Sequence, residues 1–322
     1  MDERLQLIPQ LFPEPFRSGV TALLEKSGRR VEELRFRTGT APSWVTAGRE
    51  FLIPCQNGPI LLNPAHLEEI LRRATESSAY AVQEQLRAGF LNLPYGHRLG
   101  LCGCAVMRGA EIQTIRDIQA LNLRLACERP GCAAPIVSAL RSSPCSILIL
   151  GPPRSGKTTI LRDLIRLLSD QCGWRVGLVD ERGELAACRS GRPQLSVGGR
   201  TDVLTACGKA SGIELLIRAM SPDWIAVDEI TSVSDAEAIS RAVCCGVRFL
   251  ATAHADSPED LLRRPVYRAL LETGVFDCVA VIRPDRSLHL ERINYGYREA
   301  CRIRDDPDLF CVGGTSGGPA AS

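Results

Sequence analysis

Residues 151–158 have the spacing of a phosphate-binding loop. They read Gly-Pro-Pro-Arg-Ser-Gly-Lys-Thr and follow a strongly apolar stretch, which matches the pattern Gly-x-x-x-x-Gly-Lys-Thr between a strand and a helix. The glycines let the backbone curve so that successive N–H groups face phosphate oxygens, and the start of the helix adds the positive end of its dipole. The sequence therefore predicts a phosphate site made of Gly151, Pro152, Pro153, Arg154, Ser155, Gly156, Lys157, Thr158 and Thr159.

Two carboxylates follow a second apolar run, Trp-Ile-Ala-Val at 224–227, and give it the form of a Walker B motif. Asp228 and Thr158 are expected to hold Mg²⁺, Lys157 to contact the β- and γ-phosphates, and Glu229 to orient and deprotonate the attacking water. Paired acids at a strand end can also be a solvated strand terminus. Behind a phosphate-binding loop, however, they favour hydrolysis of a nucleoside triphosphate.

The nucleotide is predicted to be ATP, bound with Mg²⁺. The chain has no Asn-Lys-x-Asp sequence of the kind that guanine-specific switches carry. A further strand, 175–179, comes between the phosphate-loop strand and the Asp228 strand along the chain. An intervening strand and a glutamate beside the Walker B aspartate are typical of ATPases with an additional central strand.

Further polar residues close other strands of the same segment. Thr252 and His254 end the next apolar run, which places them beside the γ-phosphate if the sheet is parallel, although His254 can also be a simple strand-end cap. Glu181 and Arg182 end the strand at 175–179 and are candidates for the active site or a subunit contact. A surface ion-pair cluster explains those two residues nearly as well.

Two arginines are candidates for arginine fingers that act across a subunit interface. Arg200 and Arg218 could neutralise charge on the leaving phosphoryl group of a neighbouring subunit. Each also has an ordinary explanation, because Arg218 lies on the polar face of a helix and Arg200 in a Gly-rich loop.

The pattern of the chain changes near residue 130, at Arg129-Pro130-Gly131. Residues 1–130 are predicted to form a smaller α+β domain, with an Asn63 cap before one of its helices and the elements 19–27, 33–36, 44–46 and 65–76. Residues 131–312 are predicted to form an α/β domain, a doubly wound parallel sheet of the RecA-like P-loop ATPase type, with the elements 147–150, 157–168, 175–179, 213–219, 224–227, 235–244 and 248–252. The Gly-rich residues 313–322 are predicted to be a disordered tail.

Composition excludes several classes of protein. The 39 basic and 37 acidic residues leave a net charge of +2, and only 5% of residues are aromatic, so there is no strong nucleic-acid signal. No apolar run approaches the ~20 residues of a membrane span, and the N-terminus does not have the pattern of a signal peptide, which predicts a cytoplasmic protein. The 14 cysteines are expected to be reduced, and the pairs at 102/104 and 244/245 to be buried and inert.

The run of motifs resembles the stage III sporulation protein AA family, which is itself similar to the hexameric ATPases of type II and type IV secretion systems. The resemblance is carried by GPPRSGKTTILRDLIR, VDERGELAA, GGRTDVL, IRAMSPDWIAVDEI and GVRFLATAHA in the second half, and by SSAYAVQEQLRAGF, GHRLGLCGCAV and LNLRLACERPGCA in the first. The chain departs from the family pattern at Thr231, where glycine is expected, and at Cys207-Gly208-Lys209, where Cys-Pro-Lys is more usual.

The resemblance implies a ring-forming ATPase, a hexamer, in the mother cell of a sporulating bacterium. It would work at a membrane channel to the forespore, recruited by membrane proteins of the same complex. It also implies that Arg98 or Arg124 of the N-terminal domain approaches the nucleotide. Two alternatives stay open, namely a nucleic-acid-dependent RecA-like motor and a module that binds ATP only as an assembly switch.

Overall fold

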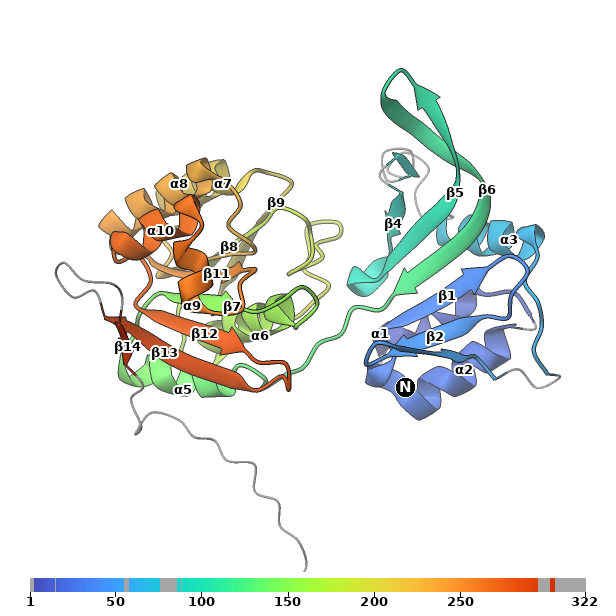
Figure 1. Cartoon of the computed structure of the whole chain (residues 1–322), viewed down its shortest axis with the longest axis horizontal. Helices are drawn as coiled ribbons and strands as arrows, with labels where there is room; N and C mark the ends of the chain where they lie inside the picture. The colour runs from blue at the N-terminus through green and yellow to red at the C-terminus, as the bar shows by residue number, and fades with distance from the viewer. Residues whose placement is uncertain are drawn as a thin grey trace, which may run out of the picture. The chain divides into compact units, whose positions relative to one another are not determined.

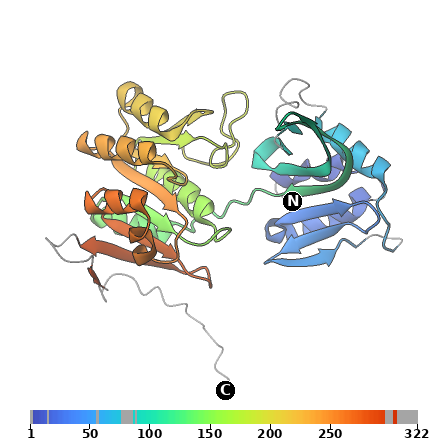
Figure 2. The same cartoon turned by 45° about the horizontal axis from the view of Figure 1, so that its top comes forward.

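The computed structural model describes residues 3–14, 16–54, 58–75, 86–87, 89–294 and 302–304 (Figure 1). The chain divides into two compact units, Met1–Cys127 and Glu128–Ser322 (Figure 2). The predicted disordered tail at 313–322 and the SSAYAVQEQ part of the family motif, residues 77–85, lie outside the described residues.

The first unit is an antiparallel sheet covered by helices. Its six strands lie in the order β3-β2-β1-β6-β5-β4. Alternate residues of the strands, such as Leu34, Phe36, Leu121 and Leu123, are buried in one core with the apolar side chains of two helices, including Leu24 and Leu67. The elements are α1 (Glu3–Gln6), η1 (Pro9–Leu11), α2 (Phe16–Ser27), η2 (Gly28–Arg30), β1 (Glu33–Arg37), β2 (Ser43–Thr46), β3 (Arg49–Leu52), α3 (Pro64–Thr75), β4 (Phe90–Asn92), η3 (Pro94–Gly96), β5 (Arg98–Arg108) and β6 (Glu111–Arg124).

The elements expected in this unit are confirmed, and so is the cap of α3. The Asn63 side chain accepts a hydrogen bond from the His66 N–H at 3.0 Å, and Pro64 is the first residue of the helix. The strands β5 and β6 form one long hairpin that bends at Gly103. A Cβ atom at Gly103 would lie 2.6 Å from the carbonyl oxygen of Arg116, so the strands approach too closely there for any side chain.

The cysteine pairs are exposed, so the prediction that they are buried was wrong. Cys102 and Cys104 lie on β5 beyond the last residue that pairs with β4, where the described residues place no strand on that side of the hairpin. Cys244 and Cys245 lie at the end of α8 (Val233–Cys244), where the chain turns at the surface.

The second unit has an eight-stranded sheet with helices on both faces. Its strand order is β14-β13-β12-β7-β11-β10-β8-β9, in which the neighbours from β12 to β9 are parallel and β13 and β14 are antiparallel. Two helices pack on one face and four on the other. The elements are α5 (Ala134–Ser142), β7 (Ile147–Leu150), α6 (Lys157–Asp170), β8 (Val176–Asp180), β9 (Thr201–Thr205), α7 (Lys209–Met220), β10 (Trp224–Val227), α8, β11 (Arg248–Ala253), α9 (Pro258–Leu262), α10 (Pro265–Glu272), β12 (Cys278–Ile282), β13 (Leu288–Asn294) and β14 (Arg302–Arg304).

This architecture confirms the predicted α/β fold, but the intervening strand is a different one. β11, the strand of residues 248–253, lies between the phosphate-loop strand β7 and the Asp228 strand β10. The strand at 175–179, assigned to that role from chain order, is β8 and lies beyond β10. Chain order does not give sheet order in a doubly wound fold, because successive strands can be added on either side of the first. Thr252, on β11, therefore lies between the phosphate-loop strand β7 and the Asp228 strand β10.

The central strands are buried on both faces. All residues of β7, β8 and β10 are buried, as expected of parallel strands that are covered by helices above and below. Their carboxyl ends meet at one edge of the sheet, where the phosphate loop and the strand-end acids come together.

The helices of the described residues are all too short or too polar to span a membrane.

Candidate nucleotide-binding site

The phosphate loop joins β7 to α6. Gly156 adopts a left-handed conformation, with φ 103°, and caps the 14-residue helix that begins at Lys157. Ser155 has a buried hydroxyl with no hydrogen-bond partner among the described residues, and a Cβ atom at Gly151 would lie 2.6 Å from it. The loop thus combines a helix N-terminus, a tight turn at glycine and an unsatisfied polar atom, which is the arrangement that a bound anion completes.

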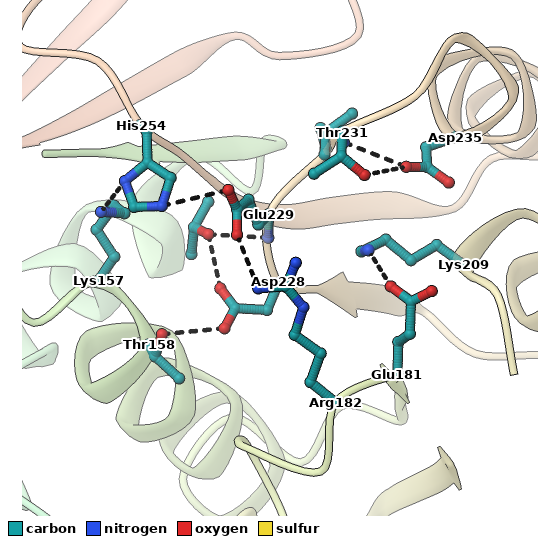
Figure 3. Close-up of polar contacts among 12 residues, drawn as sticks. Lys157, Thr158, Glu181, Arg182, Lys209, Asp228, Glu229, Thr231, Asp235 and His254 are labelled. Atoms are coloured by element: carbon teal, nitrogen blue, oxygen red, sulfur yellow. Dashed lines mark hydrogen bonds and ion pairs between the residues drawn. The ribbon is translucent and has the colours of Figure 1, made fainter. Parts of the chain in front are cut away.

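Lys157 turns back over this loop. Its ammonium donates to the carbonyl oxygens of Gly151, at 2.8 Å, and Pro152, at 2.9 Å. It also lies 2.9 Å from Nδ1 of His254 (Figure 3). Burial lowers the pKa of Lys157, against the opposing attraction of Asp228 and Glu229. No carboxylate among the described residues contacts this poorly solvated cation directly, so an anionic phosphate would stabilise it.

Asp228 is bound by two threonines from neighbouring elements. Thr158, in the first turn of α6, donates to one carboxylate oxygen at 2.9 Å, and Thr252 of β11 donates to the other at 2.6 Å. The Thr252 hydroxyl also accepts the N–H of Glu229, at 2.9 Å. The predicted Mg²⁺ ligands, Thr158 and Asp228, are therefore adjacent, and Thr252 joins Asp228 to the backbone of the predicted base.

Glu229 lies between two basic groups. One carboxylate oxygen is 3.2 Å from Nε2 of His254, and the other is 3.4 Å from the Arg182 guanidinium (Figure 3). A Lys157 ammonium that donates to Nδ1 leaves the proton of a neutral imidazole on Nε2, where it can be donated to Glu229. The backbone at Glu229 has φ 52°, a conformation that costs energy for a residue with a side chain, and Thr252 helps to hold it.

Other charged residues at this edge fix the loop after β8. Lys209, at the start of α7, is buried and forms an ion pair with Glu181. The buried Asp180 carboxylate accepts hydrogen bonds from three N–H groups of the loop. Arg162 of α6 donates to two carbonyl oxygens of the same loop. Asp180, Arg162 and Lys209 lie in stretches that carry the family resemblance, but the sequence gives none of the three a role, whereas it makes Glu181 a candidate.

The remaining site predictions fall in different places. Within one chain, Arg200 lies before β9, and thus at the opposite edge of the sheet, where its guanidinium donates to the Gly173 carbonyl oxygen at 3.1 Å. Arg218 lies in the last turn of α7, about 13 Å along the helix axis from Lys209. The chain itself therefore does not bring either arginine to Asp228 and Glu229, and an action in trans stays a prediction.

The other predicted residues keep separate surroundings. Arg154 is exposed in the phosphate loop, with φ 64°, and Pro153 is exposed beside it. In the first unit, Arg98 stacks over the Phe90 ring at 4.3 Å and Arg124 lies 3.6 Å from Glu33. Each of these two arginines therefore has a partner within its own unit.

The two departures from the family pattern are accommodated locally. Thr231 donates its N–H to Asp235 at 3.2 Å, and Ser232 and Asp235 form a capping box that starts α8. Gly208 caps α7 with an extended backbone, directly before the buried Lys209. Neither substitution therefore displaces a residue that contacts Asp228 or Lys157.

Comparison with known proteins points to one family. A family model described as "Sporulation stage III, protein AA" matches residues 6–295. Stage III sporulation protein AA of Bacillus subtilis (strain 168) is 36% identical over 275 residues, which cover 84% of this chain and 88% of that protein. The protein SEEDLING PLASTID DEVELOPMENT 1 of Arabidopsis thaliana is 30% identical over 142 residues, or 43% of this chain and 20% of the plant protein.

Two solved structures have a similar fold. The ATPase DotB of Yersinia pseudotuberculosis superposes with a TM-score of 0.58 at 15% identity, over 89% of this chain and 81% of that one. The pilus retraction motor PilT, solved with bound ADP, also gives a TM-score of 0.58, at 14% identity, over 84% and 80% of the two chains. At such identities the likeness establishes the fold, a RecA-like core preceded by a smaller α+β unit.

Proposed function

Because this chain belongs to the stage III sporulation protein AA family, we propose that it is an ATPase that hydrolyses Mg²⁺-ATP at the carboxyl edge of its parallel sheet. The observation that carries the proposal is the placement of Glu229. Its carboxylate is next to the Mg²⁺ candidate Asp228 and in contact with His254, which in turn contacts the phosphate-loop lysine. A mere anion-binding loop needs no such carboxylate.

The residues present fit Mg²⁺ and a triphosphate. Thr158 and Asp228 offer a hydroxyl and a carboxylate, the oxygen ligands that Mg²⁺ prefers, at a separation of 2.9 Å. The unsatisfied hydroxyl of Ser155 and the N-terminus of α6 face the same loop. When bound, Mg²⁺ supplies neutralisation of the β- and γ-phosphate charge.

Lys157 and Glu229 would do separate work in the reaction. Lys157 would exchange the carbonyl oxygens of Gly151 and Pro152 for phosphate oxygens, which compensate a buried cation better than neutral carbonyls do. Glu229 would accept a proton from the water whose oxygen bonds to the γ-phosphorus, as the bond to the bridging oxygen breaks and ADP leaves with the electron pair.

His254 would couple these two residues. As long as Lys157 donates to Nδ1, the imidazole donates to Glu229 and occupies one of its oxygens. When the ammonium turns to a phosphate, that constraint on the ring is released. His254 would therefore report the occupancy of the phosphate site to the catalytic base.

The family membership supports the biological part of the proposal. The chain would act as a homo-oligomeric ring, a hexamer, at a channel between mother cell and forespore, in the cytoplasm of the mother cell. It would be held at the membrane by membrane proteins of the sporulation complex. Arg200 and Arg218 would then meet the site of a neighbouring subunit, which is the arrangement that the single chain leaves open.

Steady-state ATP turnover at increasing protein concentration tests this function, with the particle mass measured on the same samples by light scattering. We expect slow turnover that rises as the ring assembles and that is lost in Lys157→Ala. Turnover that does not depend on Lys157 would contradict the assigned site. Turnover that requires added DNA or RNA would instead indicate a nucleic-acid motor.

A further inference from the structure

The loop after β8 presents one exposed arginine to the candidate base. Arg182 is the second residue beyond the strand, and its side chain is 64% exposed, whereas Glu229 is 28% exposed. A long exposed side chain loses conformational entropy when it is fixed, and an exposed ion pair contributes little by itself. The ion pair between Arg182 and Glu229 therefore indicates a function only if the surrounding backbone is fixed so that the Arg182 side chain points at Glu229.

The loop is anchored on the far side of Arg182. The buried carboxylate of Asp180 accepts the N–H groups of Glu184, Leu185 and Ala186 at 2.9, 3.2 and 2.8 Å. The buried guanidinium of Arg162 donates to the carbonyl oxygens of Leu185 and Glu184 at 2.7 and 2.6 Å. Two buried charges of opposite sign thus bind opposite sides of the same peptide groups, which fixes the loop's path.

The loop is also anchored on the near side of Arg182. Glu181 forms an ion pair with Lys209, whose side chain is only 6% exposed (Figure 3). A buried ammonium without this partner would be costly, so the pair is expected to persist. The backbone at Arg182 therefore lies between two anchored parts of the loop.

The anchor on α6 links this loop to the phosphate site. Arg162 follows Thr158 by four residues, so the two side chains lie on the same face of the helix. Thr158 bonds to Asp228, and Arg162 bonds to the loop that carries Arg182. One face of the phosphate-loop helix is therefore connected to both acids. Thr158 bonds to Asp228 directly, and Arg162 bonds to the loop whose Arg182 contacts Glu229.

We propose that Arg182 is a positioning residue for Glu229, and that the loop fixed by Asp180, Arg162 and Lys209 exists to aim it. Arg182 holds one carboxylate oxygen of Glu229, while His254 holds the other. Together they set the plane of the carboxylate against which the attacking water must lie. This inference rests on the proposed function, because it assigns Arg182 a role in the same reaction.

The test separates positioning from phosphate binding and from folding. In Arg182→Ala we expect kcat for ATP to fall about 10-fold, since small losses of alignment at a reacting group are costly. KM, the Kd of a non-hydrolysable ATP analogue and Tm should stay at the parent values. Arg182→Lys, which keeps the charge, should recover most of the rate, and Arg189→Ala, an exposed arginine of the same loop, should have no effect.

A double-mutant cycle identifies the group through which Arg182 acts. In a Glu229→Gln background, Arg182→Ala should lower the remaining rate by less than twofold, because the positioned carboxylate is already absent. A full 10-fold loss in that background would overturn the inference. A rise in KM or in the analogue's Kd would overturn it too, since Arg182 would then bind the phosphates directly.

The two claims fail in distinguishable ways. Parent turnover with an unchanged Arg182→Ala rate would reject only the role of Arg182. A parent protein that binds the ATP analogue but hydrolyses no ATP in its assembled form would reject the proposed function, and the role of Arg182 with it.

Discussion

The hydroxyl of Thr252 donates a hydrogen bond to the Asp228 carboxylate over 2.6 Å and accepts the N–H of the next residue, Glu229. Thr252 lies on β11, the strand inserted between the phosphate-loop strand and the Asp228 strand. One buried hydroxyl therefore fixes both the proposed metal ligand, Asp228, and the backbone of the proposed catalytic base, Glu229. This relationship explains why the central strand has a polar residue, Thr252, between the buried Ala251 and Ala253.

Replacement of Thr252 by valine keeps the shape of the side chain and removes the hydroxyl. We expect kcat to fall by a factor of about 10 to 100, because the Glu229 backbone, with φ 52°, loses a hydrogen bond that holds it. Leaving the partly buried N–H of Glu229 unpaired should also lower the free energy of unfolding, by about 1 kcal/mol. Thr252→Ser should restore both quantities, and a fully active Thr252→Val would contradict the assigned role.

The buried charge of Lys157 should cost stability in the absence of nucleotide. Burial lowers the pKa of Lys157 below its ordinary 10.5, against the attraction of Asp228 and Glu229. Between this lowered pKa and 10.5 the unfolded chain binds the proton that the folded chain has released, so stability rises with pH there; at pH 7 the folded state carries the full cost. Lys157→Met should therefore raise the Tm of the nucleotide-free protein, and a lower Tm would show that the carbonyl contacts outweigh the burial.

The same lowered pKa predicts how nucleotide binding depends on pH. The phosphates require the ammonium form of Lys157, and that form is lost at a lower pH than in a free lysine. The affinity for an ATP analogue, measured by calorimetry, should therefore decrease as the pH rises, and the decrease should begin at a pH lower than 10.5. The matched control is Lys157→Arg, which stays charged, so any binding that it retains should be independent of pH in this range. The same decline in the arginine variant would assign the titration to another group.

Much of the second unit could be predicted from the sequence. The strands at 147–150 and 224–227 were predicted with the bounds that they have, because short apolar runs framed by turn residues and polar strand ends leave little ambiguity. The strand at 201–205 was missed, since its residues Thr-Asp-Val-Leu-Thr are only half-buried at the sheet edge and do not form an apolar run. The strands and helices beyond residue 253, such as β12, are not among the elements that the sequence predicts.

The residues of the candidate site could likewise be predicted only in part. Lys157, Thr158, Asp228 and Glu229 belong to short motifs, and Thr252 and His254 follow once the strands are known to be parallel, because carboxyl ends then share one edge. The contacts of Lys209 and Arg162 join positions far apart in the chain through loops of irregular path. No local spacing encodes such a contact, so only the structure could identify them.

The most direct measurement is ATP turnover of the parent protein beside Glu229→Gln, at a concentration where the ring is assembled, together with the Kd of a non-hydrolysable ATP analogue for both. The substitution keeps the size of the side chain but removes the base, and its single amide oxygen can accept from only one of the two neighbours, His254 or Arg182. We predict that turnover falls by at least about 100-fold, as expected for loss of a general base, with the Kd within a factor of about 3. Turnover of Glu229→Gln at the parent rate would contradict the account, because the carboxylate that distinguishes hydrolysis from binding would then have no part in it.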